Sequence, residues 1–152
     1  LFWLMGDLSF AFNPARCLWV LAALTLAATL SARQLNVLAR GEVQAAIVGL
    51  PVAGFRHLVF IASSLATALA VTTVGVIGFI GLVVPHLVRI VAGSDHRIVV
   101  PASALAGGAL LVFADTLART VMAPRQLPVG ALTAAIGVPL FLLLMSRSQN
   151  YR

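Results

Sequence analysis

Residues 58 to 91 read LVFIASSLATALAVTTVGVIGFIGLVVPHLVRIV, an apolar run that contains a single arginine. As one α-helix this run would be about 50 Å long, well beyond the roughly 30 Å of hydrocarbon in a bilayer. Residues that favour a turn lie in and after its middle: Gly75, Gly78, Gly81 and Pro85. We therefore predict two shorter helices, 58–74 and 77–91, joined by a reversal of direction within the membrane.

The composition of the whole chain is that of a membrane protein. Of 152 residues, 61% are hydrophobic and 9% are charged, against roughly a half and a quarter in soluble domains. This excludes a disordered chain and, because no polar stretch is long, a soluble enzyme carried on one anchor. The charge of +6 comes from arginines scattered between apolar runs, so we expect no nucleic acid partner. Leu1 is not an initiator methionine and no signal peptide follows it, so we expect the chain to begin inside a longer protein.

Three further apolar blocks complete an all-α, polytopic membrane fold. The five expected spans are 16–32, 58–74, 77–91, 98–121 and 129–146. Short cytoplasmic loops carry excess positive charge, so the arginines test this number of spans. Five spans place seven arginines on one side (33, 40, 56, 89, 97, 147 and 152) and three on the other (16, 119 and 125), whereas an unbroken 58–91 gives five on each. The asymmetry favours five spans and a cytoplasmic C-terminus.

The segment 31–57, between the first two spans, is too polar for hydrocarbon and too long for a tight turn. Gly49 and Pro51 are stop and restart signals for helices, so we expect two short helices that meet at a sharp corner. Such a corner can dock into the groove of a partner. An ordinary interfacial loop is the alternative, and the residues alone favour it.

Charged residues elsewhere have a structural and a functional interpretation. Ser94 or Asp95 can cap the helix that follows. Asp115 and Arg119 lie four residues apart near the outer end of a span, on one helix face. Charge within a membrane is costly, which makes this pair a functional candidate; a snorkelling arginine with a local counter-ion is the alternative. The histidines are not spaced as a helical metal pair, and we assign them no metal.

Small residues and prolines in the last two spans predict close packing and a bend. Four residues have the small-x-x-x-small spacing that lets helices approach closely in lipid: Ser103, Ala104, Gly107 and Gly108. Pro128 suits the first turn of the last span. Gly137 and Pro139 predict a kink there, which either lines a pathway or is only a structural bend.

Several features that the sequence lacks narrow the chemistry. Without a lysine there is no G-x-x-x-x-G-K-[ST] phosphate loop, so this chain is not itself a P-loop ATPase. There is no G-x-S-x-G motif, and the four acidic residues lie in separate segments without a local carboxylate pair. We expect a chain that is not an enzyme and carries no cofactor and no metal.

Several blocks, in one order along the chain, resemble the permease subunits of type II ABC importers, the FecCD-like family that moves iron-siderophores, haem and cobalamin. The blocks are GFIGLVVPHLVR (78–89), GSDHR (93–97), PASAL (101–105), ADTLAR (114–119), PRQLPVG (124–130) and IGVPLF (136–141). WLMG (3–6) and LARGE (38–42) also resemble the family. The resemblance covers nearly the whole chain, from Trp3 to Arg147.

This resemblance implies that residues 1–152 are the C-terminal half of a ten-helix permease. It also implies that the loop 38–57 forms two short coupling helices on the ATPase subunit, and that Arg119 docks a substrate-binding protein with Asp115 as its local partner. The coupling residues would be Ala39, Arg40, Gly41, Glu42, Gly49, Leu50 and Pro51. Residues with structural or gating roles would be Gly78, Gly81, Pro85, Asp95, His96, Arg97, Asp115, Pro128, Gly130, Gly137 and Pro139.

The hypothesis that follows is a multi-pass transport subunit of the bacterial plasma membrane. Its expected partners are a second permease, cytoplasmic ABC ATPase subunits that bind ATP, a periplasmic or lipoprotein binding protein, membrane lipid and a metal-chelate substrate. An ion-coupled secondary transporter, with Asp115 carrying protons, and an intramembrane enzyme that uses Asp115 and a histidine are the alternatives. The hypothesis requires that segment 31–57 and the turn at Asp95 face the same compartment.

Overall fold

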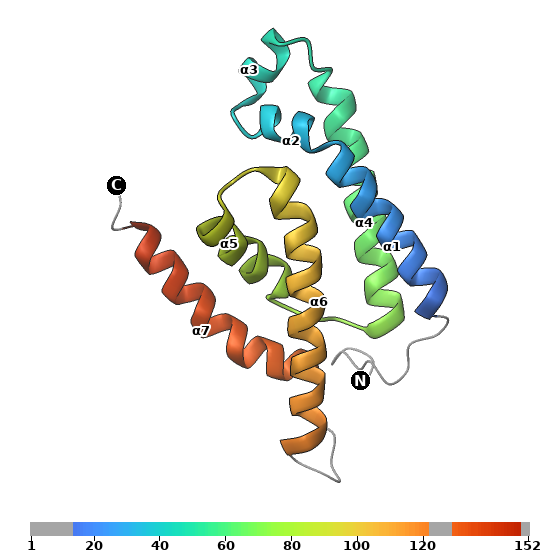
Figure 1. The fold of residues 1–152 in the computed structure, drawn as a ribbon, viewed down its shortest axis with the longest axis vertical. Helices are drawn as coiled ribbons and strands as arrows, with labels where there is room; N and C mark the ends of the chain where they lie inside the picture. The colour runs from blue at the N-terminus through green and yellow to red at the C-terminus, as the bar shows by residue number, and fades with distance from the viewer. Residues whose placement is uncertain (1–13, 122–128, 150–152) are drawn as a thin grey trace.

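The computed structural model describes residues 14–121 and 129–149, and the regular elements in these ranges are all helices. They are α1 (Pro14–Leu30), α2 (Ala32–Leu38), α3 (Glu42–Ile47), α4 (Val52–Val74), α5 (Ile80–Ala92), α6 (His96–Val121) and α7 (Val129–Gln149). Helix α6 runs through the middle of the molecule and contacts α1, α2, α5 and α7 (Figure 1). The all-α fold predicted from the sequence is confirmed.

The long apolar run 58–91 is broken, as predicted, between α4 and α5. Gly75 ends α4 with a φ of 78°, a conformation that glycine adopts at little cost. Phe79, directly before α5, has a φ of 66°, which is uncommon for a residue with a side chain. Because helical dihedral angles resume only after Phe79, α5 begins at Ile80 and not at the predicted residue 77.

The polar segment between α1 and α4 differs in detail from the prediction. Helix α1 ends at Leu30, and α2 continues at an angle of 59° to it, so the first predicted span is bent near its end. The short helix expected after Pro51 is not separate: it is the start of α4. No proline interrupts Val52–Val74, so the helix that begins after Pro51 continues into the apolar span. The two short helices of this segment are therefore α2 and α3.

Helices α2 and α3 lie at the same end of the molecule as the turn between α5 and α6, and the far end of α6 lies opposite (Figure 1). A direct contact joins the two regions: the Asn36 amide donates a hydrogen bond of 2.7 Å to the Asp95 carboxylate. This arrangement is the one that a reversal after α4 requires. It confirms that segment 31–57 and the Asp95 turn share one end of the fold.

The helices differ in how far each can reach across a bilayer. In the ranges described, α4 and α6 are long and apolar enough to cross, and the bent pair α1–α2 gives a third candidate. Helix α5 and residues Val129–Leu144 of α7 form shorter apolar helices. At 1.5 Å per residue, α5 rises about 20 Å, less than the roughly 30 Å of hydrocarbon. Five complete crossings thus remain a prediction.

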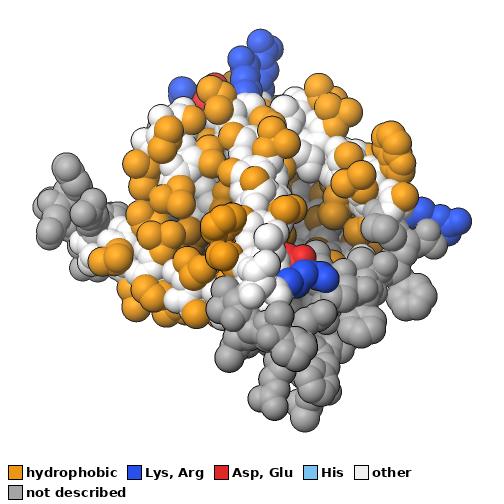
Figure 2. All heavy atoms as spheres, turned by 60° about the horizontal axis from the view of Figure 1, so that its bottom comes forward, with side chains coloured by type: hydrophobic (Ala, Val, Ile, Leu, Met, Phe, Trp, Pro, Cys, Tyr) orange, Lys and Arg blue, Asp and Glu red, His pale blue; other side chains and the backbone are white. Residues whose placement is uncertain are grey.

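The apolar side chains lie mostly on the surface. The buried cluster between α6 and α7 consists of Ala114, Ala118 and Val129, with Leu111 and Leu132 packed against it. Elsewhere large apolar side chains face outwards, and Figure 2 shows hydrophobic side chains spread over the described part of one face. Helices in lipid pack through small residues and turn their large apolar side chains outwards, so this surface fits a membrane protein.

Candidate functional site

A short helix, α3, is held between two glycine-containing turns at the tip of the polar segment. Gly41, with a φ of 122°, precedes α3, and Gly49, with a φ of 87°, follows it. The Leu50 N–H donates to the Ala45 carbonyl at 3.0 Å and closes the second turn. Pro51 is the N-cap residue of α4, which begins at Val52. The predicted coupling residues thus lie directly before and after α3 (with Glu42 as its first residue): Ala39, Arg40, Gly41, Glu42, Gly49, Leu50 and Pro51.

Helix α3 and the residue that follows it expose an apolar surface that is not among the predicted site residues. Val43, Ile47 and Val48 are 75%, 80% and 73% exposed, whereas Ala45 on the opposite side is buried. We call these three residues the α3 patch. Residues i and i+4 share a helix face, so Val43 and Ile47, apolar residues in a polar segment, were the signal that could have revealed it. An exposed charged residue, Glu42, directly precedes the patch, and protein interfaces commonly combine an apolar centre with polar residues at the edge.

One ion pair joins α3 to the start of α4. The Arg56 guanidinium lies 2.6 Å from the Glu42 carboxylate, and both side chains are about 60% exposed. Exposed ion pairs contribute about 0–1 kcal/mol, so this one orients α3 without holding it rigidly.

A second contact, much farther apart in sequence, joins α2 to the start of α6. Asp95 is the N-terminal cap of α6, because its carboxylate accepts the Arg97 N–H at 2.9 Å. Asn36 accepts the His96 N–H at 2.9 Å, lies 2.7 Å from His96 Nδ1, and donates to the same Asp95 oxygen. The hydrogen bonds from the Arg97 backbone and the Asn36 side chain lower the pKa of Asp95. We call Asn36, Asp95 and His96 the α2–α6 joint.

Two of the three residues of this joint, Asp95 and His96, are among those named in the sequence analysis. Of the two predicted caps, Asp95 is the correct one, because its carboxylate accepts the Arg97 N–H. The Ser94 hydroxyl does not make this bond. Asn36 was missed, because a lone asparagine in a polar segment carries no signal for a partner about sixty positions away.

The predicted ion pair at the other end of α6 is present. Arg119 Nε lies 2.8 Å from Asp115 Oδ2, and the two side chains are 43% and 23% exposed. His96 begins the same helix 19 residues before Asp115, which places the two residues about 28 Å apart along the helix axis. Asp115 and His96 therefore cannot act together on one substrate, which removes one form of the enzyme alternative.

Gly137 permits a close approach between α7 and the segment before α5. A Cβ built on Gly137 would overlap the Cβ of Phe79 and lie 3.1 Å from its Cγ. Helix α7 continues across Pro139, and Pro85 likewise lies inside α5. Of the other predicted structural residues, Gly130 accepts a hydrogen bond from the Thr133 hydroxyl, and Pro128 lies outside the described residues.

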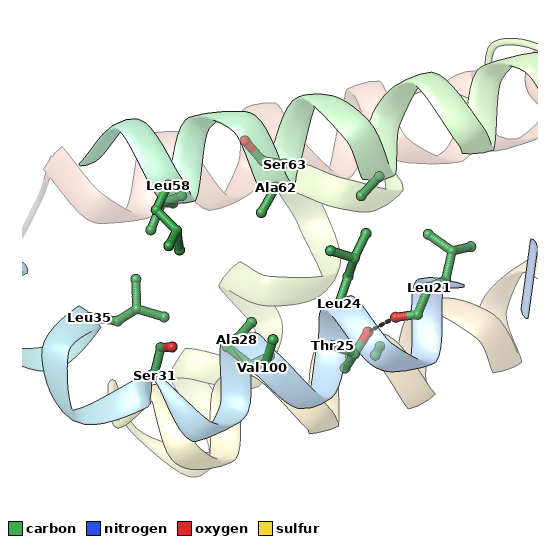
Figure 3. Close-up of a pocket in the computed structure, with 14 residues that line it drawn as sticks. Leu21, Leu24, Thr25, Ala28, Ser31, Leu35, Leu58, Ala62, Ser63 and Val100 are labelled. Atoms are coloured by element: carbon green, nitrogen blue, oxygen red, sulfur yellow. Dashed lines mark hydrogen bonds between the residues drawn. The ribbon is translucent and has the colours of Figure 1, made fainter. Parts of the chain in front are cut away.

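A cavity of about 300 Å³ lies between α1, α4 and α6 (Figure 3). Leu24, Leu35, Leu58 and Ala62 point into it. Three residues of its wall carry a hydroxyl, Thr25, Ser31 and Ser63, and those of Thr25 and Ser63 donate to carbonyls of their own helices at 2.8 Å and 3.0 Å. Because the other residues of the wall are leucines, valines and alanines, the cavity suits an apolar group better than a polar one.

Comparison with known proteins supports this description. The model of the FecCD transport family matches residues 1–147. The hemin transport system permease protein HmuU of Yersinia pestis is 48% identical over 123 residues, which cover 81% of this chain and 37% of that protein. The cobalamin import system permease protein BtuC of Halobacterium salinarum is 45% identical, over 95% of this chain and 39% of that protein.

A solved structure shares the fold. It is described as an inward-facing conformation of a metal-chelate type ABC transporter, and it matches with a TM-score of 0.85 and 31% identity. The match covers 96% of this chain and 48% of that one. The chain thus spans less than half the length of each of these three proteins.

Proposed function

Because this chain belongs to the FecCD transport family, we propose that it forms part of the permease of an ATP-driven importer in the bacterial plasma membrane. The observation that carries the proposal is the α3 patch, an exposed apolar surface on a short helix outside the apolar spans. An apolar patch of this kind marks a surface that binds another protein. The substrate class we propose is a metal chelate of the iron-siderophore, haem or cobalamin type, since relatives are named for hemin and cobalamin.

The partner that we assign to the α3 patch is an ABC ATPase subunit. This chain lacks the lysine of a phosphate loop, so ATP would be bound by the partner and this chain would need no cofactor. The two glycine turns fix the orientation of α3 at the tip of the molecule, where a cytoplasmic subunit can reach it. A subunit that holds α3 differently with and without ATP would bias the permease between two conformations.

The remaining proposed partners are a second permease and a substrate-binding protein. The binding protein would dock at the end of the fold opposite to α3. Two permeases would enclose the pathway, and a periplasmic or lipoprotein binding protein would deliver the chelate near Arg119. Helix α6 connects the two ends, since its first residues contact α2 and its last turn carries Arg119. In this scheme α6 couples the ATPase side to the binding-protein side.

We predict that Ile47→Cys crosslinks to the ATPase subunit in a nucleotide-dependent way. Ile47 is 80% exposed, so a thiol there is accessible to the partner. The measurement is the yield of crosslinked product with a thiol-specific reagent, in the assembled transporter with and without ATP. Leu26→Cys, 60% exposed on α1, is the matched control and should give no product. Absence of an Ile47 crosslink in every nucleotide state would contradict the coupling role.

We predict that Arg119→Glu slows association of the binding protein and alters its salt dependence. The substitution reverses a charge that is 43% exposed, and rim charges act mainly on association rates. Stopped-flow or surface-binding kinetics at two salt concentrations measure the effect. Asp115→Asn, which keeps the arginine and removes the negative charge beside it, is the control and should not slow association. If Arg119→Glu transports and binds as the parent protein does, Arg119 is not a docking residue.

ATP dependence separates the proposal from ion-coupled transport. In proteoliposomes, uptake of the chelate should stop when ATP is withheld and should persist when the proton and sodium gradients are collapsed. The reverse result would favour a secondary transporter.

A further inference from the structure

We propose that Asn36 is a positioning residue that transmits displacement of α3 to the start of α6. The inference rests on the proposed function, and it concerns a residue that belongs to none of the coupling turns. Its basis is the α2–α6 joint, in which one side chain completes the N-terminal cap of a helix that begins about sixty residues later.

The chemistry of the joint requires an amide. Asp95 presents only acceptors and the His96 N–H only a donor, so the amide NH₂ must face Asp95 and its oxygen must face His96. With the amide oxygen at 2.7 Å, His96 Nδ1 must carry a proton and donate it. An aspartate at position 36 has no donor for Asp95, and a leucine has neither group.

The joint also satisfies the backbone of α6. The first N–H groups of a helix lack partners within it. In α6 the Asp95 carboxylate accepts the Arg97 N–H, and Asn36, from a different helix, accepts the His96 N–H. The start of α6 is therefore bonded to α2 as well as to its own cap. A movement of α2 that keeps these bonds must move α6 with it.

A hydrogen-bonded path continues from α2 to α3. The N–H groups of Arg40 and Gly41 donate to the Val37 and Leu38 carbonyls at 3.1 Å and 3.0 Å, which holds the short turn between the helices. The side-chain link that α3 itself makes, the Glu42–Arg56 pair, is solvent-exposed and joins α3 to α4. Of these two links, the α2–α6 joint is the one that reaches the central helix.

The test uses the full permease assembled with its ATPase and binding protein in proteoliposomes. Asn36→Leu should keep ATP hydrolysis but lower the chelate taken up per ATP hydrolysed by about fivefold or more, the range of a typical coupling free energy. Gln34→Leu is the matched control: it makes the same kind of change at an exposed position of α2 and should keep the parent ratio. An unchanged ratio in Asn36→Leu would overturn the inference.

A second experiment remains decisive if Asn36→Leu assembles poorly. The starting variant carries Cys17→Ser together with Asn36→Cys and Asp95→Cys. While its two new cysteines are reduced, this permease should hydrolyse ATP with a low uptake of chelate per ATP. Bridging the two thiols with a short bifunctional reagent should restore uptake per ATP, because the joint is then rejoined covalently. Complete bridging without restoration would overturn the inference.

The two proposals fail in different ways. If the parent complex shows no ATP-driven uptake of any chelate tested, the proposed function is wrong. If the parent complex transports and Asn36→Leu keeps the same uptake per ATP, the function stands and only the role of Asn36 is lost.

Discussion

Replacing Gly137 by alanine is expected to destabilise the permease by about 1–3 kcal/mol, the usual cost of an overpacked contact. The added methyl group would overlap the Cβ of Phe79, an atom fixed to the backbone that no rotamer change can move away. Either α7 or the segment before α5 must therefore shift. The measurement is the apparent Tm of the complex in detergent or nanodiscs, at one fixed scan rate.

Two other glycines supply matched controls for this effect. A Cβ at Gly108 meets no atom within 4 Å, and a Cβ at Gly107 would lie 3.6 Å from Ile80, an ordinary contact. Both are inside α6, where alanine is the better helix former, so these variants should keep or slightly raise the Tm.

A rescue variant identifies the contact itself. Phe79→Gly removes the opposing Cβ and also the side chain that is held at positive φ. The double variant with Gly137→Ala should therefore lose less stability than the two single changes added together. Additive losses would show that the methyl group at position 137 meets some other atom.

A charge placed in the α3 patch is expected to prevent assembly with the ATPase. Val43→Asp combined with Ile47→Asp would bury two unpaired carboxylates in the proposed interface, and charges are costly to bury without partners. A hot-spot residue at the centre of an interface contributes about 2 kcal/mol or more, roughly thirtyfold in affinity. Co-purification of the ATPase with tagged permease, followed by titration in detergent, measures the loss.

The control is a substitution close to the α3 patch that leaves its apolar side chains in place. Arg56→Ala breaks the exposed pair with Glu42, and it should reduce affinity far less than the two aspartates do. Wild-type affinity in the doubly charged variant would mean that the ATPase binds elsewhere on the permease.

Local features of the sequence were sufficient to predict the long apolar helices and the break between α4 and α5, but not the short helix α2. Gly75 stops α4 within the run 58–91, and Gly49 and Pro51 lie at the corner before α4. Asp95 caps α6, and Asp115 pairs with Arg119 one helical turn away. Each of these depends on residues within a few positions of one another, so propensity and spacing were enough. The start of α5 was misplaced by three residues, because the positive φ of Phe79 has no signature in a residue with a side chain.

The sequence alone therefore determined that this chain is a bundle of apolar helices with a polar segment between the first two spans. Only the tertiary structure decided which distant residues meet: Asn36 with Asp95, and Gly137 with Phe79. It also decided that Val43 and Ile47 face outwards. The physical reason lies in the apolar composition of the helices. In soluble proteins an apolar stripe marks the packed face of a helix, but helices that are apolar all round carry no such mark. Their pairing depends on small residues and isolated polar contacts, which take effect only when the helices are side by side.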